Sequence, residues 1–184
     1  YEAPPSHHVP KEMEHYLLWF NRSFHNGMPS LVHAGLAHLY FELIHPFEDG
    51  NGRIGRAIAE KALAMGAKHP LITSLSSILE RNKKAYYQAL ANANGSLDVT
   101  DWLVYFSKEV VKAQSQVQKL ILFIVEKARY FENFREKLNG RQSKVALRLF
   151  REGPEGFKGG LSAANYMRIC TTSPATATRD LAEM

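Results

Sequence analysis

Apolar positions recur at helical spacing in one segment of the chain after another. Residues 10–23 form the first such segment, and it ends in the polar stretch NRSFHNG. Its apolar side chains, three or four positions apart, are Met13, Tyr16, Leu17 and Phe20. This spacing predicts an amphipathic helix.

A second helix is predicted over residues 30–44, SLVHAGLAHLYFELI. Ser30 is a suitable N-cap because its hydroxyl can accept a hydrogen bond from a free N–H of the first turn. The helix must stop near His45, since a residue before proline is disfavoured in the α conformation. His45 is therefore expected at a helix end and not on a helix face.

The next helix is predicted to start at Gly52 or Arg53 and to close at Pro70. The side chains expected to point inward from it are Ile54, Ile58, Ala62 and Met65. Residues 76–94 then predict a pair of helices that stops at Gly95, and residues 99–138 predict one long amphipathic helix or two. Strict alternation of apolar and polar residues does not persist anywhere, so the main domain is predicted to be all-α.

The pattern changes at residues 139–144, where Gly140 is expected to break the long helix. A further helix is predicted over residues 143–153. Two short helices follow, with Ser162 and Ser173 as N-caps and a turn through Cys170 between them. The last helix is predicted to expose Thr176, Thr178 and Arg179 and to bury Ala177 and Leu181. Helix, turn, helix is the simplest interpretation.

Composition limits the classes of protein to consider. The 184 residues are 45% hydrophobic and 22% charged, as in a globular protein, and no apolar run is long enough to span a membrane. The single cysteine, Cys170, excludes an internal disulfide and fits a cytoplasmic location. A net charge of +5 leaves room for an anionic partner. The chain opens at Tyr1 without a signal-peptide pattern, as expected of a fragment of a longer protein.

Residues 42–57, ELIHPFEDGNGRIGRA, carry the candidate chemistry. Gly50 and Gly52 let the backbone approach a phosphate closely at a helix N-terminus, where free N–H groups favour an anion. Arg53 and Arg56 add positive charge that can fork to phosphate oxygens. Asp49 could hold Mg²⁺. A histidine such as His45 can take a proton from an attacking hydroxyl near neutral pH.

Two other interpretations of this stretch fail. An EF-hand loop that began at Asp49 would need glycine where Ile54 stands and is further defeated by Arg53. A P-loop needs a lysine followed by serine or threonine, which the stretch lacks.

HPFEDGNGR followed by IGR resembles the signature of the Fic family at every specified position. The resemblance extends over roughly residues 1–113 and is followed by a connecting helix, residues 114–139. The tail, residues 140–184, resembles a truncated winged helix-turn-helix domain. The implied fold is an all-α Fic domain followed by this small domain. The implied activity is transfer of AMP from ATP, with Mg²⁺, to a hydroxyl of a target protein.

The resemblance also implies roles for single residues. His45 would be the base that deprotonates the target hydroxyl, Phe47 would anchor the loop in the core, and Asp49 would bind Mg²⁺. The nucleotide-binding residues implied are Asp49, Gly50, Asn51, Gly52, Arg53, Ile54, Gly55, Arg56, Tyr86, Tyr87 and Asn94. Core packing is the competing interpretation for one of the two tyrosines.

Several alternatives stay open at this point. The flap that aligns a target segment would precede Tyr1, and the family's inhibitory helix is absent from the sequence. The chain could instead be a DNA-binding regulator with an idle Fic body, or a Fic enzyme that removes AMP or transfers another nucleotide or phosphate group. For the tail, docking to a protein or homodimerisation is favoured over DNA binding, because Arg168 and Arg179 are the only basic residues of its last two helices.

Overall fold

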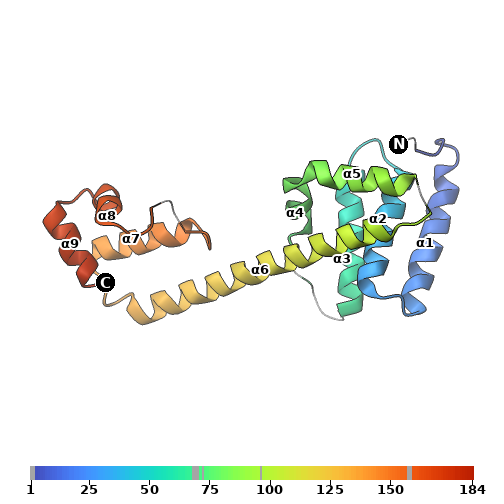
Figure 1. Ribbon diagram of the computed structural model, residues 1–184. Helices are drawn as coiled ribbons and strands as arrows, with labels where there is room; N and C mark the ends of the chain where they lie inside the picture. Colours follow the sequence, from blue (N-terminus) through green and yellow to red (C-terminus); the bar gives the residue numbers. More distant parts are fainter. Residues whose placement is uncertain (1–2, 68–70, 72, 96, 157–158) are drawn as a thin grey trace. The chain divides into compact units, whose positions relative to one another are not determined.

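Nine helices connected by short loops account for the described part of the chain, and no strand occurs in it (Figure 1). The computed structural model describes residues 3–67, 71, 73–95, 97–156 and 159–184. The predicted stop at Pro70 lies outside the described residues, as does Tyr1. The all-α prediction is confirmed. No helix of the described residues is both long and apolar enough to cross a membrane.

The chain forms two units, residues 1–117 and 118–184. The first unit contains α1 (Val9–His25), α2 (Ser30–Ile44), α3 (Asn51–Ala67), α4 (Leu75–Arg81) and α5 (Lys83–Asn94). The second contains α7 (Gly140–Arg151), α8 (Ala163–Cys170) and α9 (Pro174–Ala182). One continuous helix, α6 (Thr100–Phe134), contributes residues to both units.

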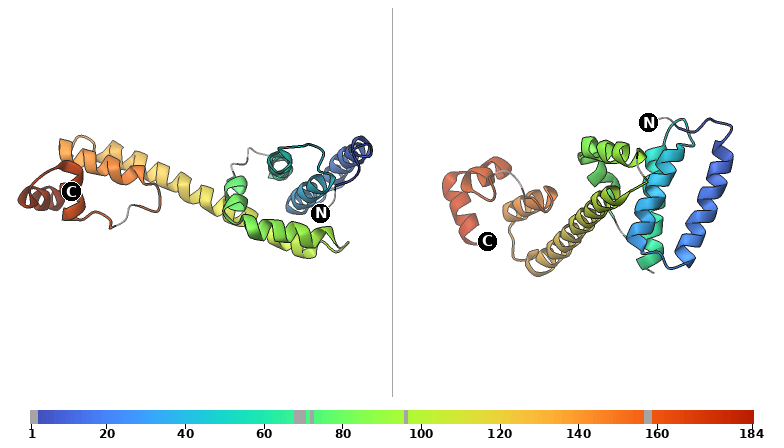
Figure 2. Two further views of the ribbon diagram at one scale, coloured as in Figure 1. Left: turned by 90° about the horizontal axis from the view of Figure 1, so that it is seen from above. Right: turned by 45° about the vertical axis from the view of Figure 1, so that its right-hand side comes forward.

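Helix α2 is the central helix of the first unit, contacts both α1 and α3, and lies between them in the left view of Figure 2. Eight of its fifteen residues are buried, because its apolar residues surround the whole helix and leave no polar face. The indole N–H of Trp102 on α6 donates to the carbonyl of Gly35 at 2.8 Å, and the hydroxyl of Tyr16 on α1 donates to that of Ala37 at 3.1 Å. These two buried bonds attach α6 and α1 to the backbone of α2.

The prediction that Ser30 caps α2 is wrong. Pro29 occupies the N-cap position, and Ser30 is the first helical residue. A Cβ built on Gly66 of α3 would lie only 2.4 Å from the Cβ of Ser30. Ser30 therefore marks the point where α2 and α3 cross in close contact, which sequence spacing does not reveal.

One position predicted to point inward from α3 is exposed instead. Ile54 is 38% exposed, whereas Ala62 of the same helix is buried as expected. On α1, Leu17 is 53% exposed, while Tyr16 and Phe20 are buried. Ile54 lies in the first turn of α3, next to the motif loop, so apolar character alone misplaced this residue.

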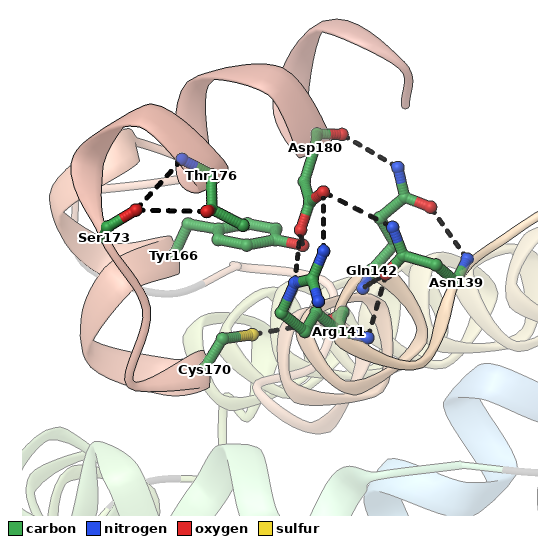
Figure 3. A network of polar contacts seen from close by, with 8 residues as sticks. All are labelled: Asn139, Arg141, Gln142, Tyr166, Cys170, Ser173, Thr176 and Asp180. Carbon is green, nitrogen blue, oxygen red and sulfur yellow. Dashed lines mark hydrogen bonds and ion pairs between the residues drawn. The ribbon is translucent and has the colours of Figure 1, made fainter.

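A buried carboxylate organises the second unit (Figure 3). Asp180 of α9 is 1% exposed and accepts two hydrogen bonds from the guanidinium of Arg141, at 2.6 and 3.0 Å. The hydroxyl of Tyr166 donates to the same carboxylate at 2.8 Å, and Asn139 donates at 3.4 Å. These bonds lower the pKa of Asp180 to about 2, the pair with Arg141 being the main cause. The hydrogen bonds to this carboxylate therefore connect α7, α8 and α9.

Local signals of the second unit were predicted with mixed success. Ser162 and Ser173 do cap α8 and α9, accepting from the N–H groups of Asn165 and Thr176. Gly140 does not break a helix, because α6 already ends at Phe134 and Gly140 begins α7. The side chain of Asn139 caps α7 in a reciprocal arrangement with Gln142. Thr176 is half-buried and not exposed, and its hydroxyl lies 3.0 Å from that of Ser173.

Candidate active site

His45 stands at the C-terminal end of α2 in a left-handed conformation, with φ 50° and ψ 56°. Its N–H still donates to the carbonyl of Phe41 at 3.0 Å, so the residue closes the helix. A non-glycine residue in this region costs on the order of 1 kcal/mol, and such strain is often found at functional sites. Pro46 prevents the helix from continuing. His45 therefore emerges exposed at the helix end, as the sequence predicts.

Asn51 shapes the loop that follows. Its side-chain oxygen accepts from the N–H of Phe47 at 3.0 Å, and its amide donates to the carbonyl of Phe47 at 2.5 Å. Only 3% of Asn51 is exposed, so this side chain folds the loop. The prediction that Phe47 anchors the loop in the core is wrong, because Phe47 is 48% exposed. The loop is held instead by the two hydrogen bonds between the Asn51 side chain and the Phe47 backbone, called the Asn51 clamp below.

The loop leads directly into the N-terminus of α3. Gly50 has φ 88°, a conformation that other residues rarely adopt, and its carbonyl accepts the first helical bond from Ile54 at 3.0 Å. Helix α3 starts at Asn51, slightly earlier than predicted. The N–H groups of its first turn have no partner within the helix. They and the helix dipole make this end suited to bind an anion.

The charged residues of the motif contact one another or neighbouring elements. Arg53 pairs with Asp49 at 3.1 Å, and both side chains are mostly exposed. Such a surface pair is worth about 0–1 kcal/mol and can yield to a stronger ligand. The other oxygen of Asp49 accepts from the N–H of Gly50 at 2.6 Å. Arg56 donates from Nε to the hydroxyl of Ser76 on α4 at 3.1 Å, a contact that the sequence did not indicate.

Two adjoining pockets lie on this side of the first unit. The polar one is lined by Glu42, His45, Glu48, Asp49, Gly50, Asn51, Gly52, Arg56, Tyr86 and Tyr87. The apolar one is lined by Glu42, Leu43, His45, Tyr87, Leu90, Ala91 and Asn94. Glu42, His45 and Tyr87 belong to both linings. A ligand with a charged end and a flat apolar end could therefore occupy both pockets.

The two tyrosines of α5 have different environments. Tyr86 is 4% exposed, and its hydroxyl lies 2.8 Å from Nε2 of His38. Burial raises the pKa of Tyr86 and lowers that of His38 to about 4, so this pair is neutral. Tyr87 is 56% exposed and borders both pockets. Tyr86 accordingly packs in the core at the pocket floor, and Tyr87 is the more accessible of the two.

Not every predicted nucleotide-binding residue borders these pockets. Among the described residues, Arg53, Ile54 and Gly55 are absent from both linings. Gly55 is buried and faces α2, where an added Cβ would lie 2.5 Å from Oε1 of Glu42 and 3.0 Å from Nδ1 of His38. Gly55 therefore serves the close approach of α2 and α3.

Sequence reasoning did not single out Glu42, although it borders both pockets. The available signal was its position three residues before His45, one helical turn away on α2. No group of three or more histidine, cysteine, aspartate or glutamate side chains in the described residues could hold a metal ion. A cation at Asp49 would therefore need most of its ligands from a bound substrate.

Residues 1–63 match the Fic/DOC family. These residues are about a third of the chain and lie within the first unit. The match includes His45 and the whole loop that leads into α3, so it covers the polar part of the site. It ends within α3 and does not extend to α5, which contributes Tyr86, Tyr87 and Asn94.

The chain is similar to proteins named as adenylyltransferases. A probable protein adenylyltransferase of Aquifex aeolicus (strain VF5) is 29% identical over 104 residues, which are 56% of this chain and 30% of that protein. The protein adenylyltransferase Fic of Drosophila ananassae is 33% identical over 82 residues, 45% of this chain and 16% of that protein. The chain thus spans less than a third of the curated relatives it matches.

A solved structure supports the fold. The crystal structure of a Fic family protein from Desulfovibrio desulfuricans superimposes with a TM-score of 0.53 and 23% identity. It covers 98% of this chain and 49% of the other chain. At this identity the likeness concerns the fold alone. It agrees with an all-α Fic architecture.

Proposed function

We propose that the Fic domain transfers AMP from ATP to a hydroxyl group of a target protein. The observation that carries the proposal is one pocket that brings His45, at the end of α2, to the N-terminus of α3 with Gly50, Gly52 and Arg56. A proton acceptor next to an anion-binding helix end is what attack by a hydroxyl on a phosphate requires.

The residues of the pocket have different roles in the proposed reaction. The target hydroxyl oxygen attacks the α-phosphorus, the bond from that phosphorus to the bridging oxygen breaks, and pyrophosphate leaves. His45 takes the hydroxyl proton. The N–H groups at the start of α3 and the guanidinium of Arg56 stabilise the phosphate charge, which is the main contribution a protein makes to phosphoryl transfer.

Asp49 is the residue proposed to hold Mg²⁺. Its carboxylate is exposed and lies beside the helix N-terminus where the phosphates would bind. Mg²⁺ is usually bound by one or two carboxylates together with substrate phosphates and water, so a single acidic side chain fits. When bound, the ion would supply additional neutralisation of phosphate charge. Arg53, released from Asp49, would then be free to contact the phosphates.

The apolar pocket is proposed to take the adenine. Its wall combines Leu43 and Leu90 with the ring of Tyr87 and the amide of Asn94, a flat apolar surface with one polar group. Binding sites for small molecules have this composition in general. The proposal thus assigns Tyr87 and Asn94 to the base and leaves Tyr86 to the core.

Intact-protein mass spectrometry tests the proposed activity. The chain is incubated with Mg²⁺ and each nucleoside triphosphate in turn, and self-modification is expected to add the mass of AMP from ATP. His45→Ala should reduce the rate by about 10²–10⁴ while nucleotide binding is retained, because a general base is lost. The matched control is His15→Ala, which removes an exposed histidine of α1 and should leave the rate unchanged.

The added mass also decides between AMP transfer and its alternatives. A phosphate or a different nucleotide would identify another donor, and loss of AMP from a modified protein would identify the reverse reaction. Unchanged transfer by His45→Ala would refute the assignment of the base.

For the second unit we propose docking to a protein. Residues 118–184 contain 12 Lys and Arg against 7 Asp and Glu, which by itself would suit DNA. However, Arg141, Arg148 and Arg168 already contact Asp180, Glu152 and Asn165. Helix α9 offers only Arg179 as a basic residue. A gel-shift experiment checks this: a DNA complex that is lost in Arg179→Ala would favour DNA binding instead.

A further inference from the structure

Three carboxyl groups border the pocket proposed to hold a triphosphate: those of Glu42, Glu48 and Asp49. Repulsion by all three would oppose binding of a polyanion. Asp49 is paired with Arg53 and is the proposed metal ligand, and Glu48 is exposed to solvent, which screens its charge. Glu42 has neither compensation. The state of this side chain therefore matters for nucleotide binding.

The side chain of Glu42, on α2, lies against α3. Its Oε1 is shielded from solvent and accepts no hydrogen bond from the described residues. This oxygen lies 2.5 Å from the position of a Cβ at Gly55 and 3.9 Å from that of one at Gly52. An ionised carboxylate with a buried, unpaired oxygen is costly, whereas the neutral acid leaves much less charge unsatisfied.

The groups around Glu42 come from every element packed against it. They are His38 and His45 on its own helix, Arg56 on α3, Tyr86 and Tyr87 on α5, and the loop residues Glu48 and Asp49. Burial raises the pKa of Glu42, and the charges of His45 and Arg56 oppose this rise. Tyr86 and His38 are neutral, as described above.

Arg56 is a strong cation that acts on Glu42, but it does not form an ion pair with it. Its Nε bonds to Ser76, and its Nη1 lies 3.1 Å from the Cβ position at Gly52. None of the ion pairs within 4.0 Å found in the described residues joins Arg56 to Glu42. A phosphate bound by Arg56 would engage this cation further and add negative charge beside Glu42. Both effects favour the protonated carboxyl.

We propose that Glu42 enters the nucleotide complex as a neutral carboxylic acid, takes up one proton from solvent on binding, and donates a hydrogen bond to a phosphate oxygen. The buried Oε1 stays against α3, and the other carboxyl oxygen carries the proton into the pocket. A carboxylic acid kept neutral by its surroundings is an effective donor to an anion. This inference rests on the proposed function, since it takes a nucleotide as the ligand.

Calorimetry with ADP tests the inference. ADP offers phosphates and base but lacks the γ-phosphate, so transfer of AMP with loss of pyrophosphate does not complicate the titration. The full chain is titrated at several pH values in buffers with different ionisation enthalpies, and the dependence of the heat on the buffer gives the number of protons exchanged. The same titration is done with Glu42→Gln, Glu42→Ala and, as matched control, Glu48→Gln.

At pH values where free Glu42 is ionised, the unsubstituted chain should take up nearly one proton more than Glu42→Gln. Its affinity relative to that variant should fall by up to tenfold per pH unit, as linkage to one proton requires. Glu42→Gln is permanently neutral and should bind at least as tightly at high pH. Glu42→Ala should lose the proton uptake and bind more weakly, and Glu48→Gln should keep the uptake.

Three results would overturn the inference. Equal proton uptake by the unsubstituted chain and Glu42→Gln would show that Glu42 does not change its protonation. Tenfold weaker binding by Glu42→Gln at every pH, with its thermal unfolding unchanged, would show that the carboxylate is needed. Absence of a new protonated-carboxyl band in the infrared difference spectrum with ADP would exclude it without a substitution. Failure of the unsubstituted chain to bind ADP would instead reject the proposed function, and this inference with it.

Discussion

Substitution of Gly66 tests the crossing of α2 and α3. In Gly66→Ala the new Cβ would lie 1.7 Å from Oγ and 2.4 Å from Cβ of Ser30. Rotation of the serine side chain can move Oγ away but cannot move Cβ, so the two helices must separate at this point. Overpacking of this kind costs about 1–3 kcal/mol.

A helical glycine replaced by alanine gains up to about 1 kcal/mol from helix propensity. The net loss expected for Gly66→Ala is therefore about 0–3 kcal/mol of the free energy of unfolding. Ser30→Gly should relieve the clash. The loss of stability caused by Gly66→Ala should therefore be smaller when it is made in Ser30→Gly than when it is made in the original chain. Gly95→Ala, in the same unit, is the control for substitution without a clash, because the nearest atom to its Cβ would lie 4.0 Å away.

Urea unfolding followed by tryptophan fluorescence is the suitable assay. Trp19 and Trp102 are the two tryptophans of the chain, and both lie in the first unit. Nucleotide affinity should change little, because Gly66 lies at the opposite end of α3 from the pocket. If Gly66→Ala changes the free energy of unfolding by the same amount with Ser30 present and in Ser30→Gly, the close crossing of the helices is refuted.

Three further outcomes are expected. Asp49→Ala should raise the Mg²⁺ concentration needed for transfer, measured by activity at varied Mg²⁺; a similar rise in Glu48→Ala alone would move the metal to that residue. Arg56→Ala should weaken ATP binding by at least tenfold in calorimetry, because a charged hydrogen bond is worth about 1.5–3 kcal/mol, and unchanged affinity would remove its phosphate role. The lowered pKa of Asp180, about 2 against an ordinary 3.8, contributes stability above pH 4 that is lost as the pH falls toward 2. Asp180→Asn should lower the stability of the second unit at neutral pH and remove this acid dependence in circular dichroism melts, and an unaltered pH profile would contradict the role of the charge.

Local signals predicted the parts of the fold that depend on nearby residues. The stop of α2 at His45 follows from Pro46, and the starts of α8 and α9 follow from Ser162 and Ser173, because each signal acts within one turn. The loop that leads into α3 was predicted for the same reason. The residues that match the Fic/DOC family include this loop.

Features that depend on contacts distant in the sequence were not predicted. Ser30 resembles a cap but packs against Gly66, and Phe47 resembles an anchor but is replaced in that role by the Asn51 clamp. Glu42 looked like an ordinary helical glutamate, since only the position of α3 buries its Oε1 at the pocket. Periodicity and capping rules contain no information about which helices meet.

The clamp made by Asn51 also affects how the protein ages. Asn51 precedes Gly52, and asparagine followed by glycine is the dipeptide most prone to spontaneous deamidation, which needs the side-chain amide to fold back onto the next backbone nitrogen. Both ends of that amide are engaged by Phe47, and the residue is buried at a helix start. The folded loop thus withholds the amide from this reaction. Deamidation would put a carboxylate at the N-terminus of α3, where the proposed function needs an anion to bind, so opening of the loop would let the site inactivate itself slowly.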